Sequence, residues 1–211
     1  MAQYLSIHPR NPQPRLVRAA ARIVMDGGVI VYPTDSCYAL GCAPDNKEGR
    51  DRICRVRELD AHHPFTLVCR DLADLATYAV VDNRAYRVLR AHTPGPYTFV
   101  LPATREVPRR LLDPKRRTIG LRVPDHAVTQ ALLAELGSPL MSVSLVLPGA
   151  DMPLGDPQEI RQQLEHFVDA VVDGGPCTGN ATSVLVWEQG DFHVHRAGMG
   201  DVSGFAPAET G

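Results

Sequence analysis

The sequence has little lysine, few aromatic residues and no long hydrophobic run. Only Lys47 and Lys115 are lysines, so arginine carries almost all of the positive charge. The arginine side chain presents a planar set of donors that suits phosphates and carboxylates, although a bias in genome base composition would produce the same excess. Aromatic residues make up 6% of the chain, so we expect a core of Val, Leu, Ile and Ala.

Several classes of protein are excluded by what is missing. No apolar run approaches the ~18 residues of a membrane span, and residues 1–12 are polar and proline-rich, unlike a signal peptide. The five cysteines are an odd number with no regular pairing, and no second pair accompanies Cys37 and Cys42 at a metal-binding spacing. We therefore expect a cytoplasmic protein with reduced thiols, no metal site and no membrane partner.

The overall composition is that of an ordinary globular protein, with 211 residues, 44% hydrophobic residues and a net charge of −2. The length suits one large domain or two small ones, and no Pro/Gly/Ser-rich linker divides the chain. We predict a single domain over residues 1–211, with a core at about residues 10–203 and a flexible tail over residues 204–211.

Hydrophobic periodicity predicts helices and strands that alternate along most of the chain. The predicted helices are 14–26, 46–59, 71–78, 83–92, 126–137 and 156–169, and the predicted strands are 29–32, 65–69, 97–101, 118–123, 140–146 and 170–173, followed by a hairpin over 183–196. Such alternation predicts an α/β fold with a largely parallel or mixed sheet. Ligands of such sheets bind at the carboxyl ends of strands.

Two stretches in these places carry charge. The stretch PTDSCYALGC (33–42) follows a buried strand. It is either a turn in which the Asp35 side chain hydrogen-bonds to the nearby backbone, or a loop that binds a ligand. In RICRVREL (52–59), Arg52 is expected to be solvated. Arg55 and Arg57 would lie about 200° apart on a continuous helix, but both could turn toward one cleft if the helix ended near Arg55.

Two later stretches place polar side chains on core strands. Arg122 falls near the end of a buried strand, where it either pairs with a carboxylate of the protein or holds an anionic ligand. Ser142 and Ser144 alternate and so face the same side of a strand, where neighbouring backbone or a ligand could satisfy them. No P-loop, G-x-G-x-x-G or G-x-S-x-G motif is present.

Six motifs in order resemble the YrdC/YciO family, whose best-known activity is synthesis of L-threonylcarbamoyladenylate from threonine, bicarbonate and ATP for tRNA modification. They are GGVIVYPTDSCYALGC, CRVREL, TPGPYTFVLPAT, TIGLRVP, SVSLVLPG and HRAGMGD, which together span nearly the whole chain. IHPRNPQ, VPRRLL and KRRTIGLRVP are similar to the YciO branch. The resemblance implies one three-layer α/β domain, with a twisted sheet around a concave, positively charged cavity.

The resemblance also implies roles for particular residues. Arg55 and Arg57 would be catalytic, as the anion clamp that faces the nucleotide phosphates and the carboxylates. The nucleotide and amino-acid substrate would be bound by Thr34, Tyr38, His63, Thr118, Arg122, Ser142, Ser144, Thr182 or Ser183, and Arg196. ATP would be a substrate, with or without Mg²⁺, and no organic cofactor is expected.

The chain also departs from the synthase pattern. Arg55 replaces a lysine, Glu58 replaces a proline, and His63 replaces a lysine or asparagine. The family's serine-x-asparagine motif ends in an asparagine, which Val146 replaces in this chain. A valine side chain makes no hydrogen bond, so that polar contact is lost. The resemblance therefore implies a cleft that binds ATP or threonylcarbamoyl-AMP and acts on the acyl-phosphate linkage, by synthesis or by hydrolysis, whereas the departures count against synthase activity.

The alternative function is non-catalytic binding of double-stranded RNA or tRNA. A basic cluster between two predicted strands suits A-form phosphates, and a salt-bridged surface loop would have the same composition. With Arg105 and Arg122 at its two ends, the cluster contains the candidate RNA-binding residues Arg109, Arg110, Lys115, Arg116 and Arg117.

Overall fold

The structure is a computed structural model that describes residues 1–60, 63–177 and 179–207. Its helices are α1 (Pro14–Met25), α2 (Lys47–Arg57), α3 (Leu72–Tyr78), α4 (Asn83–His92), α5 (Ala127–Leu136), α6 (Pro157–Leu164) and the short 3₁₀ helix η1 (Arg109–Leu111). None of the helices in the described ranges is long and apolar enough to cross a membrane.

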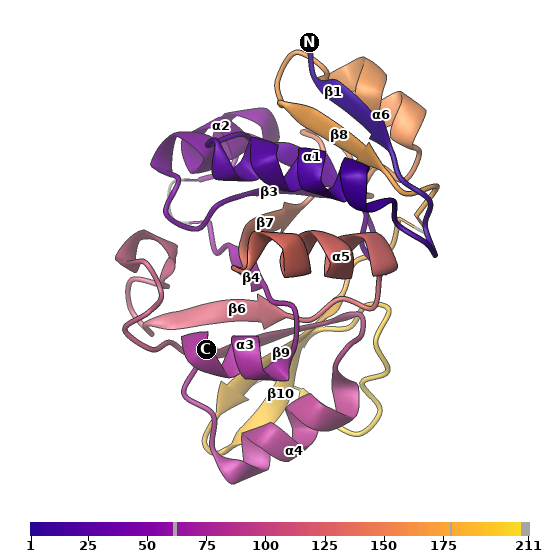
Figure 1. Ribbon diagram of the computed structural model, residues 1–211. Coiled ribbons are helices and arrows are strands. Elements are labelled where there is room, and N and C mark those ends of the chain that lie inside the picture. The colour runs from indigo at the N-terminus through magenta and orange to yellow at the C-terminus, as the bar shows by residue number, and fades with distance from the viewer. Residues whose placement is uncertain (61–62, 178, 208–211) are drawn as a thin grey trace.

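The strands form one mixed sheet in the order β1-β8-β2-β3-β7-β4-β6-β5-β9-β10-β11 (Figure 1). Their bounds are β1 (Gln3–Ser6), β2 (Ile30–Tyr32), β3 (Ala39–Cys42), β4 (Thr66–Val68), β5 (Tyr97–Pro102), β6 (Thr118–Arg122), β7 (Leu140–Ser144), β8 (Ala170–Asp173), β9 (Ser183–Glu188), β10 (Asp191–Arg196) and β11 (Ala206–Pro207). Parallel and antiparallel pairs both occur, so the predicted mixed α/β fold is confirmed.

Local sequence explains where most helices begin. Asn46, Asp71 and Asp82 are N-caps whose side chains accept hydrogen bonds from backbone N–H groups of the first turns of α2, α3 and α4. Such caps satisfy donors that the helix itself leaves unpaired. Pro14 and Pro157 occupy the first turns of α1 and α6, where a missing N–H costs nothing.

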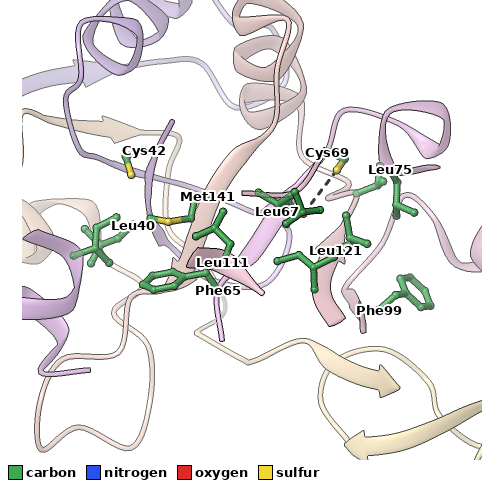
Figure 2. Close-up of a cluster of buried hydrophobic side chains, with 14 of the residues drawn as sticks. Leu40, Cys42, Phe65, Leu67, Cys69, Leu75, Phe99, Leu111, Leu121 and Met141 are labelled. Carbon is green, nitrogen blue, oxygen red and sulfur yellow. Dashed lines mark hydrogen bonds between the residues drawn. The ribbon is translucent and has the colours of Figure 1, made fainter. Parts of the chain in front are cut away.

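The two faces of the sheet pack against different helices. One face contributes side chains such as Leu40, Leu67, Leu121 and Met141 to the large core shown in Figure 2, to which α2, α3, α4 and α6 also contribute. The opposite face packs residues of β2, β3 and β7 beneath α1 and α5, which contact each other along their length. Figure 1 shows α1 and α5 on the same side of the sheet.

Four elements differ from the sequence prediction. β1 pairs in parallel with β8, about 165 residues later in the chain, and was not predicted. The stretch 33–42 is only in part a loop, because its second half is β3. α6 ends at Leu164 rather than near residue 169. In the predicted flexible tail, Ala206–Pro207 pairs with β10 as β11, and residues 208–211 lie outside the described residues.

Candidate functional site

A strip of small and polar side chains crosses the sheet on the face that α1 and α5 cover only in part. Paired residues on neighbouring strands point to the same face, and the register places Ser142 opposite Thr66, Thr66 opposite Gly120, and Gly120 opposite Val100. Residues two positions away on each strand share this face. The polar strip is therefore Thr66, Thr98, Thr118, Gly120, Arg122, Ser142 and Ser144.

Burial shows that part of the polar strip is open to solvent. Thr66, Thr118 and Ser144 are half-buried, whereas the residues that follow them in the chain, Leu67, Ile119 and Leu145, are at most 2% exposed. The hydroxyls of these three residues make no hydrogen bond to another residue in the part of the chain that the structure describes. They are therefore free to meet a ligand.

The other two hydroxyls of the polar strip are engaged within the protein. Ser142 accepts a hydrogen bond from the Tyr32 hydroxyl at 2.7 Å and donates to the Leu40 carbonyl at 3.2 Å. Burial raises the pKa of Tyr32 to about 12, so this phenol remains a donor. The hydroxyl of Ser142 is therefore hydrogen-bonded within the protein, the first of the two alternatives for this residue.

The loop 33–38 is held in place by its own hydroxyls. Thr34 Oγ1 donates to the Cys37 carbonyl at 2.6 Å and accepts from the N–H groups of Ser36 and Cys37 at 3.2 Å. Tyr38 Oη donates to the Gly175 carbonyl at 2.7 Å, which ties the loop to the end of β8. Thr34 and Tyr38 therefore fix the shape of this loop.

Asp35 and Arg122 form a buried ion pair at the polar strip, with side chains 11% and 7% exposed. Arg122 also donates to Ser36 Oγ at 2.9 Å. Of the two alternatives for Arg122, pairing with a carboxylate of the protein is the one observed. His126 stands beside the pair, and burial lowers its pKa while the nearby Asp35 carboxylate opposes that shift.

Arg57 and His63 lie together near the same loop. Burial lowers the pKa of the half-buried Arg57 guanidinium, and the nearby Cys37 thiol opposes that shift. Burial also lowers the pKa of His63, and the positive charge of Arg57 lowers it further. The His63 ring meets Phe65 edge-on, with ring centres 5.7 Å apart.

The structure does not bring Arg55 to this place. α2 continues to Arg57, and Glu58 ends it in the left-handed conformation, so Arg55 lies exposed on the other side of the helix. Arg52, expected to be solvated, instead pairs with Asp169, which also accepts from the Val29 N–H at 2.7 Å. That pair fastens α2 to β2 and β8.

Thr182, Ser183 and Arg196 lie beyond β5, at the end of the polar strip. The hydroxyl of Thr182 meets that of Thr98 at 2.9 Å, and Arg196 donates to the Thr182 carbonyl at 3.0 Å. Ser183 is fully buried and donates to the Gly200 carbonyl at 2.6 Å. The Ser183 hydroxyl is thus used in a hydrogen bond to the loop that follows β10. Arg196, in contrast, is exposed.

The basic cluster occupies the exposed connection between β5 and β6, which leads directly into Thr118. Arg110 donates to the Pro44 carbonyl at 2.9 Å, and Arg116 pairs with Glu188 at 2.5 Å. Arg105, Arg109, Lys115 and Arg117 are exposed. The candidate RNA-binding residues therefore gather on one connection next to the polar strip.

Comparison with known proteins identifies the family. The family model described as "Telomere recombination", that of the Sua5, YciO and YrdC proteins, matches residues 22–198. The chain belongs to the Sua5/YciO/YrdC family. YciO of Escherichia coli (strain K12) is 52% identical over 205 residues, which is 97% of this chain and 100% of that protein. Its crystal structure matches with a TM-score of 0.93.

More distant members of the family carry a named activity. A threonylcarbamoyl-AMP synthase of Idiomarina loihiensis is 34% identical over 168 residues, or 78% of this chain and 88% of that protein. Sua5 of P. abyssi, complexed with L-threonine, matches with a TM-score of 0.84 at 21% identity, over 92% of this chain and 57% of that chain. The likeness to Sua5 shows the shared fold.

Two residues near the site were given no specific binding role from the sequence. Asp35 was visible as a carboxylate after a buried strand, but only the fold shows that it meets Arg122, 87 residues later. His126 follows a strand end and a proline, and its neighbours are likewise distant in sequence. A polar residue three or four positions after a buried strand was the available signal for both.

Proposed function

We propose that this protein binds L-threonine and an adenine nucleotide on the polar strip, as threonylcarbamoyl-AMP or as its precursors with bicarbonate. It acts at the acyl-phosphate bond of that adenylate, by synthesis or hydrolysis, and serves tRNA threonylcarbamoyladenosine chemistry. Membership of the Sua5/YciO/YrdC family and the 34% identity to a threonylcarbamoyl-AMP synthase support the proposal.

The observation that carries this proposal is a group of buried polar atoms without protein partners. Asp35 Oδ2, Arg57 Nε, Arg122 Nε and His126 Nδ1 are all buried and make no hydrogen bond to any residue that the structure describes. A buried polar atom left unpaired is costly. Free L-threonine offers an ammonium and a carboxylate, and threonylcarbamoyl-AMP keeps a hydroxyl and a carbamoyl N–H as donors beside its carboxylate and phosphate, so either ligand offers donors and acceptors together.

Chemistry at this place would be electrostatic. Arg57 holds a half-buried positive charge, and such a charge stabilises negative charge that develops on transferring oxygens. The free hydroxyls of Thr66, Thr118 and Ser144 are suited to ribose and phosphate oxygens. Val146 offers no side-chain hydrogen bond where the synthase pattern has asparagine, so hydrolysis or slow synthesis is expected rather than fast synthesis.

The residues do not fit a magnesium ion held by the protein. Within the described ranges, no three His, Cys, Asp or Glu side chains form a group that could hold a metal ion, and the Asp35 carboxylate is paired with Arg122. Mg²⁺ is often held by substrate phosphates together with one or two carboxylates. Any magnesium requirement would therefore come from the nucleotide.

The test is Arg57→Ala, assayed for diphosphate release from ATP with threonine and bicarbonate, and for AMP release from threonylcarbamoyl-AMP. We expect turnover to fall by about 10² or more, the loss typical of removing one stabilising donor, with an unchanged circular dichroism spectrum. Arg87→Ala, which removes an exposed arginine from α4, is the control. Native turnover in Arg57→Ala would contradict the assignment.

The exposed basic connection favours RNA binding as the second candidate function. Its phosphate contacts would release counterions, so affinity for a double-stranded RNA should fall steeply with salt. Replacing Arg109 and Lys115 by alanine should reduce that slope by about two. A slope near zero in the native protein would exclude phosphate contacts.

A further inference from the structure

A cavity of about 630 Å³ lies away from the polar strip, where α2 faces the end of α1, the start of β1 and the turn after α6. No residue of the polar strip or of the loop 33–38 lines it. Its volume falls within the range of sites that bind small molecules in proteins, about 300–1,000 Å³.

Apolar side chains form much of the lining. Ile23, Val56 and Val168 come from α1, α2 and the segment before β8. Phe167 is 55% exposed although it is a large aromatic residue. An exposed ring at the edge of such a cavity offers a flat surface on which another ring can stack.

The charges of the lining leave Arg55 without a partner. Arg52 is paired with Asp169. Glu165 lies 3.8 Å from the Arg161 guanidinium and 3.6 Å from the His166 ring nitrogen. The acidic residues of the lining are thus engaged, whereas the Arg55 guanidinium makes no ion pair or hydrogen bond with another described residue. The remaining positive charge favours an anion.

We propose that this cavity binds a flat, anionic small molecule of about mononucleotide size, with its ring against Phe167 and its anionic group on Arg55. Helix geometry separates this site from the polar strip, because residues two positions apart point in nearly opposite directions. One helix, α2, would then present Arg55 to one ligand and Arg57 to another. This proposal does not depend on the reaction proposed for the polar strip.

The test uses the fluorescent probe 1-anilinonaphthalene-8-sulfonate, which combines flat rings with one anionic group. Its fluorescence would be titrated with the native protein and with Arg55→Ala, Phe167→Ala and Arg55→Lys. We expect about tenfold weaker binding for each alanine variant, the loss typical of one charged or stacking contact. Arg55→Lys should recover part of the affinity because it keeps the charge.

Matched controls are available on α4, where Tyr86 and Arg87 are likewise an exposed aromatic and an exposed arginine. Tyr86→Ala and Arg87→Ala should leave probe binding unchanged. The proposal is overturned if these controls lose as much affinity as the test variants, or if Arg55→Ala binds like the native protein. It is also overturned if Arg57→Ala removes the binding, since the probe would then lie at the polar strip.

Discussion

The buried pair between Asp35 and Arg122 makes a quantitative prediction for Asp35→Asn. The substitution removes one charge but keeps an oxygen that can accept from Arg122, and the guanidinium, 7% exposed, stays buried. Breaking a buried ion pair by removing one partner costs about 3–5 kcal/mol. Because the hydrogen bond can persist, we expect the lower end, about 3 kcal/mol. For a chain of this size that corresponds to a fall in Tm of about 6–12 °C.

The assay is urea and thermal unfolding followed by circular dichroism, with Asp26→Asn as the matched control. Asp26, the C-cap residue of α1, faces Arg22 at 3.9 Å, and their side chains are 73% and 83% exposed. Exposed pairs of this kind contribute less than about 1 kcal/mol, so the control should shift Tm by no more than about 2–4 °C. Equal, small shifts in both variants would refute the view that Arg122 depends on the Asp35 charge.

Two further predictions concern pH and packing. Burial lowers the pKa values of His63 and His126 in the folded protein. As the pH falls below about 6.5, the pKa of an unperturbed histidine, the unfolded chain therefore binds more protons than the folded protein does. Stability should therefore fall as the pH drops from 7 toward 5, and His63→Gln/His126→Gln should flatten that slope in urea unfolding; an unchanged slope would contradict the assigned shifts. A Cβ at Gly200 would lie 2.3 Å from the Tyr97 ring, whereas one at Gly204 would meet nothing within 4 Å. Gly200→Ala should thus cost about 1–3 kcal/mol and Gly204→Ala almost nothing, and similar Tm values for the two variants would contradict the packing described.

Elements with strong local signals could be predicted from sequence. Pro14, the apolar face of α1 and the following glycines mark that helix, and Asn46, Asp71 and Asp82 mark three more. β1 was missed because QYLS is short and has no strong alternation, and its partner β8 is distant in sequence. β3 was missed because its sequence, ALGC, contains small residues and a glycine, a composition typical of loops.

The site was harder to predict than the fold because its contacts join distant segments. Ser142 could be assigned to the correct strand, but nothing local shows that Tyr32, 110 residues earlier, donates to its hydroxyl. Arg55 and Arg57 share one motif, and only the continuation of α2 to Arg57 places their side chains on different sides. The face of a strand to which a side chain points, in contrast, follows from alternation along the sequence. Ser142 and Ser144 could therefore be placed on one face.

The most direct test of the central claim is a crystal structure of this protein grown with ATP, L-threonine and bicarbonate. We predict a ligand on the polar strip, with the free hydroxyls of Thr118 and Ser144 in contact with it and with Arg57 facing an anionic group. A ligand that contacts none of these residues, or a polar strip without ligand at saturating concentrations of all three substrates, would contradict it.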